Sequence, residues 1–183
     1  MITKPTKNGI ILKVNSSQKE RAMLGDIEIS IGVKYKTNHR DKHPVIGVVV
    51  ATEKPSIEIG SILVVHHNFL YGDNSVYSMG DGLFSIPVNH NIFMRIDANG
   101  EPHSMFGNII CERLEEYSLF EKPGAHVKLY HDRARVISNG YGYKNGDIVF
   151  TTPYSTYEII YNYAKKERRV IKIYKDDICA IIK

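Results

Sequence analysis

Histidine is the residue of this sequence best suited to binding a metal, and the chain contains eight of them. His66 and His67 are adjacent in a predicted strand, so their side chains point to opposite faces and cannot hold one ion together. Four others lie on separate segments, namely His90, His103, His126 and His131. Neither cysteines nor carboxylates stand near them at the spacing of a metal site. We therefore expect neither a metal site nor a bound cofactor.

The segment from Asp73 to Ser85, DNSVYSMGDGLFS, is rich in glycine and serine, the residue types of nucleophile turns and phosphate-binding loops. It contains neither a Gly-x-Ser-x-Gly turn nor a phosphate-binding loop motif. Because no nucleophile or acid–base pair stands out elsewhere, the sequence predicts that the protein is not an enzyme. The segment is either a surface hairpin or a contact with a protein partner through exposed Met79, Leu83 and Phe84.

The densest group of cations is KKERR, which spans Lys165 to Arg169 and is flanked by tyrosines. Cations beside aromatic rings can bind nucleic acid, here through Lys165, Lys166, Arg168 and Arg169. The alternative is the solvated tip of a hairpin between two strands. The net charge of +4 is too small to require a nucleic-acid partner, so we expect the hairpin.

The elements that must position these residues are short runs of apolar and β-branched residues, separated by Gly, Pro, Asn or Asp. This pattern is typical of strands and turns, and many short strands favour an all-β barrel or sandwich. With 183 residues, 43% of them hydrophobic, the chain can form one medium domain or two small ones. Two cysteines are typical of a reducing cytosol, and no apolar run reaches the roughly 18 residues of a membrane helix. We expect a cytoplasmic protein without membrane contact, or a virion protein if the chain is encoded by a phage.

The chain also resembles itself. Gly60-Ser61-Ile62 and Gly146-Asp147-Ile148 each lead from a turn into an apolar strand. The strand within residues 8–14, NGIILKV, is similar to GNIICERL at residues 107–114. We expect two repeats, residues 1–101 with a long loop at 15–44, and residues 102–183, joined by a polar segment.

The second half carries a pattern known from another family. GDIVF, a strand containing YEII, a hairpin and then RVIKIYKDDICAIIK resemble the C-terminal half of the GroES-type co-chaperonins, also called the chaperonin-10 family. GNIICERLEE resembles that family's opening strand, and the first half carries a fainter likeness in GIILKV, IGVVVA, IEIGSILVV and IFMRID. The resemblance implies two tandem GroES-like small β-barrels.

In that family the last strand of one subunit pairs with the first strand of the next. The resemblance therefore implies a homo-oligomer, with the interface formed by Ile178, Ala180, Ile181 and Ile182 of the last run and by Ile10 and Leu12 of the first. Both faces of the last run are apolar, so both require a cover. The alternatives are an internal strand that closes its own sheet, or pairing with the other half of the same chain.

A GroES-type co-chaperonin also binds its chaperonin through a loop after the first strand, which presents a short apolar tripeptide. The comparable residues here are Gly25, Ile27, Glu28 and Ile29. Glu28 would have to face solvent, because an unpaired carboxylate is costly to bury. The alternative is that IEISIGVKY forms an ordinary strand with alternating faces.

Two main functions follow from these patterns. One is a co-chaperonin-like ring that caps a chaperonin, and the other is a structural or assembly protein of a phage particle built on the same fold. A nucleic-acid-binding β-barrel is a minor alternative.

Overall fold

The computed structural model describes residues 5, 9–14, 21–24, 27–30, 44–66, 69, 75–116, 128–138, 140–152, 157–163 and 166–183. Within them the chain forms β-strands and one short 3-10 helix, η1 (Lys175–Asp177), so the prediction of an all-β protein is confirmed. The strands are β1 (Gly9–Lys13), β2 (Arg21–Leu24), β3 (Ile27–Ser30), β4 (Val45–Thr52), β5 (Ile62–Val65), β6 (Tyr77–Gly80), β7 (Leu83–Pro87), β8 (Ile92–Ile96), β9 (Pro102–Ser104), β10 (Asn108–Glu116), β11 (Lys128–Val136), β12 (Ile148–Thr151), β13 (Tyr157–Tyr163), β14 (Lys166–Tyr174) and β15 (Ile178–Ile182).

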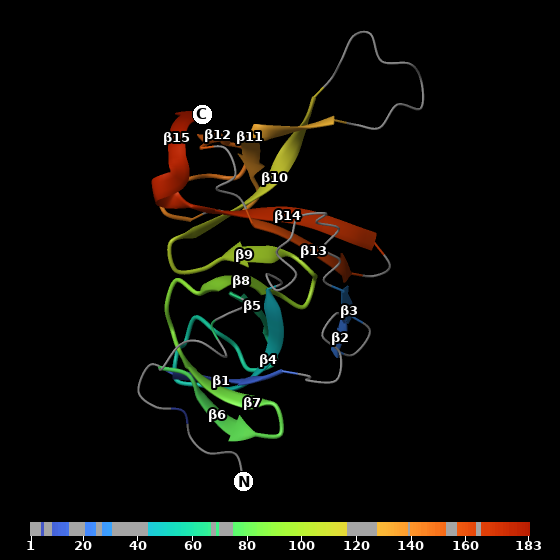
Figure 1. Ribbon diagram of the computed structural model, residues 1–183, viewed down its shortest axis with the longest axis vertical. Helices are drawn as coiled ribbons and strands as arrows, with labels where there is room; N and C mark the ends of the chain where they lie inside the picture. The colour runs from blue at the N-terminus through green and yellow to red at the C-terminus, as the bar shows by residue number, and fades with distance from the viewer. Residues whose placement is uncertain are drawn as a thin grey trace, which may run out of the picture.

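Two antiparallel sheets lie one above the other along the long axis of the molecule (Figure 1). The lower sheet has the strand order β6-β7-β1-β4-β5-β8-β9, and the upper sheet has the order β13-β14-β10-β11-β12-β15. A separate hairpin, β2-β3, lies at the side of the molecule. In the described part of the chain no ladder joins the two edge strands of either sheet, so both sheets are open and the expected closed barrels are not formed there.

The two sheets share one topology. If β1, β4, β5, β6, β7 and β8 are matched in chain order with β10, β11, β12, β13, β14 and β15, the neighbours of each strand are the same in both sheets. The lower sheet has one further strand, β9, which continues the ladder beside β8 although it follows the expected boundary between residues 101 and 102. Each half is therefore one copy of the same six-strand arrangement.

The match extends to single hydrogen bonds at the turn before β5 and the turn before β12. In the lower sheet Val49 N donates to Ser61 O at 2.9 Å, and Gly60 N donates to Val49 O at 2.8 Å. In the upper sheet Val136 N donates to Asp147 O at 2.8 Å, and Gly146 N donates to Val136 O at 2.9 Å. The two glycines have φ of 86° and 95°, a region that favours glycine because other residues carry a Cβ atom.

The β5–β8 and β12–β15 ladders also share their register. In the lower sheet Ile62 pairs with Ile96, and a bulge follows Val64. In the upper sheet Ile148 pairs with Ile182, and the bulge follows Phe150. Because a shift of one residue would turn every side chain to the other face, this common register makes residue-by-residue equivalence between the halves possible.

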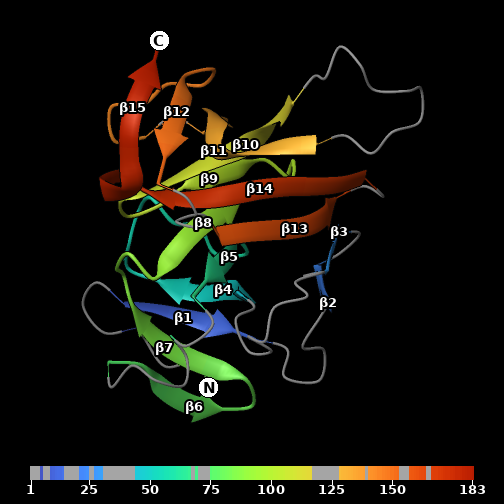
Figure 2. The same ribbon diagram turned by 45° about the horizontal axis from the view of Figure 1, so that its top comes forward.

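Buried side chains form three clusters. One lies in the lower half and includes Ile10, Leu12, Leu63, Phe69 and Phe84, while a smaller one in the upper half includes Ile109, Cys111, Val149 and Ile173. The third cluster lies between the halves. Figure 2 shows β13 and β14 of the upper sheet passing over β8 and β5 of the lower sheet at this level.

The buried cluster of the lower half leaves no space beside Gly47, which gives a first prediction. A Cβ atom at this position would lie 2.4 Å from Cγ of Leu12, so Gly47→Ala is expected to reduce the free energy of unfolding by about 1–3 kcal/mol. In the upper half Ala134 is equivalent to Gly47, and Cys111 is equivalent to Leu12. There a residue larger than glycine faces a residue smaller than leucine. Urea unfolding should therefore show recovery when Leu12→Cys is added to Gly47→Ala. A neutral Gly47→Ala would contradict the close contact between Gly47 and Leu12.

Candidate protein-binding surfaces

The junction between the halves is built on one face of the lower sheet. Alternate residues of β5 and β8 turn toward the upper half, and all are at most 2% exposed. They are Ile62, Val64, Met94 and Ile96, which cluster with Ile46 of β4. Ile159, Tyr161 and Val170 of the β13–β14 hairpin cover them. Each apolar side chain of this size contributes about 1.5–3 kcal/mol when buried, so the junction is a stable part of the fold.

Polar contacts fix the orientation of the halves. Tyr161 is buried, and its hydroxyl donates to Gly100 O at 3.1 Å. Burial raises the pKa of Tyr161 to about 12, so the hydroxyl remains a donor at neutral pH. Ser104 N donates to Oγ of Ser138 at 2.8 Å. Asn108 also donates to the carbonyl oxygens of His90 and Ile92, each at 3.0 Å.

The predicted cationic cluster is partly used in this junction. Arg168 binds Glu101 through two hydrogen bonds, with Nη2 2.7 Å from Oε1 and Nη1 3.2 Å from Oε2. Arg169 donates to Glu167 at 2.7 Å. Lys166 begins β14, and Lys165 lies outside the described residues. Two of the four cations proposed for nucleic acid therefore already face carboxylates.

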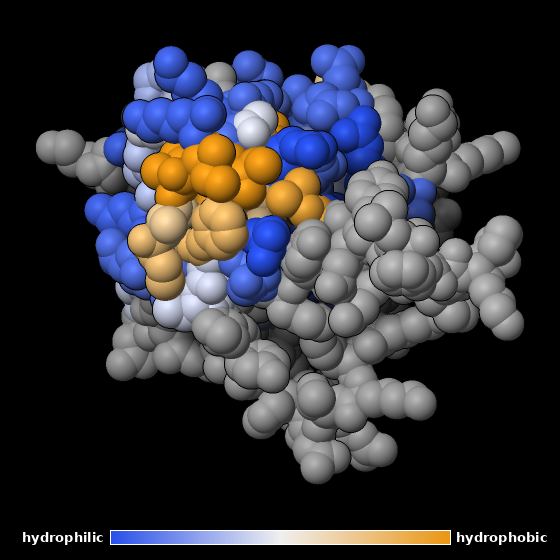
Figure 3. All heavy atoms as spheres, turned by 90° about the horizontal axis from the view of Figure 1, so that it is seen from above, coloured by the Kyte–Doolittle hydropathy of each residue, from blue (hydrophilic) through white to orange (hydrophobic). Residues whose placement is uncertain are grey.

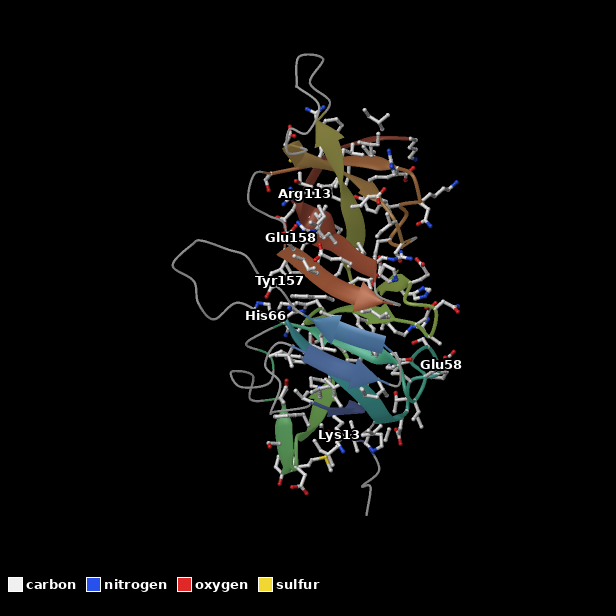
Figure 4. The ribbon with its side chains drawn as sticks, turned by 90° about the vertical axis from the view of Figure 1, so that its right-hand side faces the viewer. Lys13, Glu58, His66, Arg113, Tyr157 and Glu158 are labelled. Atoms are coloured by element: carbon white, nitrogen blue, oxygen red, sulfur yellow. The ribbon has the colours of Figure 1, made fainter. Side chains whose placement is uncertain are left out.

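Lys172 is the most unusual side chain of the junction. It is 3% exposed, and its Nζ lies 4.8 Å from the ring centroid of Phe93 and 2.8 Å from that of Tyr174. Burial lowers its pKa to about 7, although the charge of Asp177 acts in the opposite direction. Phe93 in turn contacts Tyr157 edge-on, with ring centroids 5.2 Å apart. In Figure 4, His66 and Tyr157 lie next to one another where the halves meet.

The first predicted partner contact lies in the β6–β7 hairpin at the lower end of the molecule. Met79 and Leu83 are partly exposed, whereas Phe84 is 8% exposed and packs in the buried cluster of the lower half. This corrects the expectation that Phe84 is available to a partner: strand alternation turns it inward between Leu83 and Ser85. Tyr77, which the sequence analysis did not select, is 71% exposed on the same hairpin.

The second predicted contact lies in the β2–β3 hairpin. Ile27, Glu28 and Ile29 belong to strand β3, which pairs with β2 and lies against β13 of the upper half. This matches the strand alternative for these three residues, while Gly25 lies outside the described residues. Whether the hairpin binds a partner stays a prediction.

The predicted oligomer interface is divided between two different environments. β15 is the edge strand of the upper sheet, where Ala180, Ile181 and Ile182 are exposed and Ile178 is partly buried. Ile10 and Leu12 have no exposed surface, and β1 is hydrogen-bonded on both sides, to β7 and β4. This corrects the expectation for these two residues, because β1 offers no free edge to a neighbouring chain.

Of the histidines considered from the sequence, His66, His90, His103 and His131 are on separate segments of the described structure, while His67 and His126 lie outside the described residues. His103 Nε2 lies 2.9 Å from Oδ2 of Asp97, and His66 contacts the ring of Phe93. Among the described residues there is no group of three or more His, Cys, Asp or Glu side chains that could hold a metal ion. The same part of the chain contains no helix long and apolar enough to cross a membrane.

Sequence reasoning missed Phe93, Tyr157 and Lys172, which meet at the junction. One signal was present: Lys172 interrupts the apolar run VIKIY, where a charged residue in a buried strand needs an explanation. Comparison of the chain with protein-family models, with curated proteins and with solved structures found no match. A proposal for the function therefore rests on the geometry of the molecule and on its sequence.

Proposed function

We propose that this chain is a non-enzymatic, oligomeric protein that works through protein contacts, with each half a GroES-like unit. The observation that carries the proposal is β15, an edge strand at the end of the repeated sheet with apolar side chains exposed on it. An exposed apolar edge strand favours association with another chain, because in the described part of the chain the backbone groups on its outer side have no ladder and its apolar side chains reach the surface.

The form of this function that the sequence resemblance favours is a co-chaperonin-like cap. The long connection after β1 carries the β2–β3 hairpin, at the place where the GroES-type family presents its chaperonin-binding segment. In this form of the function, strand β3 of the hairpin would supply Ile27 and Ile29 as apolar contacts. β-strand addition and apolar anchors are common ways of binding a protein through such a segment.

The test is gel filtration of the protein with a chaperonin in the presence and absence of ATP. The wild type should elute with the chaperonin when ATP is present, and the double variant Ile27→Ser/Ile29→Ser should not. Ile59→Ser is the matched control, because Ile59 is 68% exposed on a different turn. Equal capture of the wild type and the double variant would exclude the hairpin as the contact.

A second candidate is a structural protein of a viral particle or of another fixed assembly. One observation favours it: β3 lies against β13 of the other half, so the hairpin is part of the body of the molecule (Figure 1). This candidate predicts that the protein is present in purified particles and has no ATP-dependent partner. Capture by a chaperonin with ATP would decide for the first candidate.

A further inference from the structure

The repeat makes one comparison possible between two faces of the same molecule. Because β5–β8 and β12–β15 share their register and bulge, Ile62 and Ile96 correspond to Ile148 and Ile182. The same ladders place two further pairs at equivalent positions, Val64 with Phe150 and Met94 with Ala180. We name the upper set, Ile148, Phe150, Ala180 and Ile182, the free face.

The equivalent faces differ in what covers them. The lower face is buried under the β13–β14 hairpin, with every member at most 2% exposed. On the free face Ile182 is 55% exposed, Ala180 is exposed, and Ile148 and Phe150 are only partly buried. Viewed from above, apolar side chains gather into one patch at the end of the molecule that carries β12 and β15 (Figure 3). An apolar patch of this kind usually marks a protein interface.

The repeat also identifies what should cover this face. The hairpin β13–β14 corresponds to β6–β7 by strand order. Tyr157 pairs with Lys172, which pairs with Ile110 of β10. Tyr77 has the same place in the lower sheet, since it pairs with Ser85, which pairs with Ile11 of β1. Tyr77 is therefore the equivalent of Tyr157, a residue of the junction, yet it is 71% exposed.

The two surfaces lie at opposite ends of the long axis, the β6–β7 hairpin at the bottom and β15 at the top (Figure 1). They cannot meet within one molecule. We propose that the β6–β7 hairpin of a second copy of this chain covers the free face, and repeats between molecules the contact that β13–β14 makes within one. This inference rests on the proposed function and deepens it by naming the partner as a second copy and the two surfaces that join.

The joint is heterologous, since the two surfaces differ, and repeated heterologous contacts form a closed ring or a filament. The internal junction indicates which residues should meet at the centre of the joint between two molecules. Tyr157 meets Phe93 at 5.2 Å, and Phe93 corresponds to Cys179 in β15. Tyr77 of one copy should therefore lie against Cys179 of the next. Arg133, whose guanidinium lies 5.3 Å from the ring of Phe150, takes the place of Ile46, so the joint between molecules is more polar than the internal one.

The test is the mass of the purified protein in sedimentation velocity, using Tyr77→Glu and Ile182→Glu. Both positions are exposed, so neither variant should impair folding. The wild type should form species heavier than the 20.8 kDa chain, and each variant alone should remain a monomer. Mixed in equal amounts, the variants should form a dimer, because the intact free face of one accepts the intact hairpin of the other. Ile59→Glu, exposed on an unrelated turn, should assemble like the wild type.

A second measurement uses the thiol of Cys179, which is exposed. Tyr77→Cys treated with a short bis-maleimide should give cross-linked dimers and longer species, and adding Cys179→Ser should abolish them. A monomeric wild type, or a variant mixture that stays monomeric, overturns the proposal. Dimers formed by Tyr77→Glu alone would also overturn it, since they require contact between two free faces. The proposed function fails on a different result: oligomers that persist in both glutamate variants would leave an oligomeric, protein-binding function standing while this joint fails.

Discussion

Phe93→Ala is expected to lower the free energy of unfolding by about 3–5 kcal/mol. Phe93 has no exposed surface and lies between the halves, edge-on to His66 at 5.7 Å and to Tyr157 at 5.2 Å. Its removal would leave a cavity at the centre of the junction. It would also take away one of the two rings that lie beside the buried amine of Lys172, 4.8 Å away.

The repeat supplies a matched control for this prediction. Cys179 occupies the same place in β15 but is exposed, so Cys179→Ala should change stability by less than about 0.5 kcal/mol. Urea unfolding followed by circular dichroism measures both variants. If the two substitutions have similar effects, the junction does not depend on Phe93 and the halves are held together in another way.

Much of the local structure could be predicted from the sequence, because local signals determine it. The turns at Gly60 and Gly146 need a positive φ, and each is followed by a β-branched apolar run, so strand and turn are both visible in a few residues. The all-β class follows from many such runs. The equivalence of Gly60 and Gly146 in the two repeats was also visible in the sequence, and the turn hydrogen bonds are the same at the two sites.

What the sequence could not provide is which apolar face is covered, and by what. Ile96 and Ile182 are equivalent and chemically identical, yet one is 1% exposed and the other 55%. The difference arises from the packing of β13–β14 onto the lower sheet, a contact between segments far apart in the chain. Similarly, the apolar run that contains Leu12 could form either an edge strand or a central strand. Only the ladders of the structure place β1 between β7 and β4.

The same long-range contact explains Lys172. In the sequence it is one charged residue within an apolar run, and either face of the strand could carry it. In the structure its strand lies between β13 and β10, and its amine is enclosed by rings from both halves. The unusual pKa of this lysine is therefore a property of the junction.

Lys172 should make the stability of the protein depend on pH near neutrality. Its pKa is about 7 in the folded protein and near the ordinary 10.5 in the unfolded chain, because burial disfavours the charged amine. Below pH 7 both states carry the proton. As pH rises through 7 the folded state releases it while the unfolded chain retains it, so stability increases by up to about 1.4 kcal/mol per pH unit.

Other groups limit this rise at higher pH. Burial raises the pKa of Cys111 to about 12 from an ordinary 9.0, and it raises the pKa of Tyr157 above that of a free tyrosine. For these groups the folded state retains a proton that the unfolded chain has lost, so once pH exceeds about 9 their loss of stability offsets the gain from Lys172. The contribution of Lys172 should therefore be seen between about pH 7 and pH 9, where it amounts to about 2 kcal/mol.

Lys172→Met tests this directly, since methionine fills a similar volume without a titratable amine. In urea unfolding at a series of pH values, the wild type should become more stable from pH 7 to about pH 9, and the variant should remain level over this range. Lys13→Met is the control, because Lys13 is exposed on β1 and should leave the rise unchanged. A rise that persists in Lys172→Met would place its source in another group. A wild type with flat stability would mean that the amine is charged in the folded protein, held by a partner stronger than the two rings and Asp177.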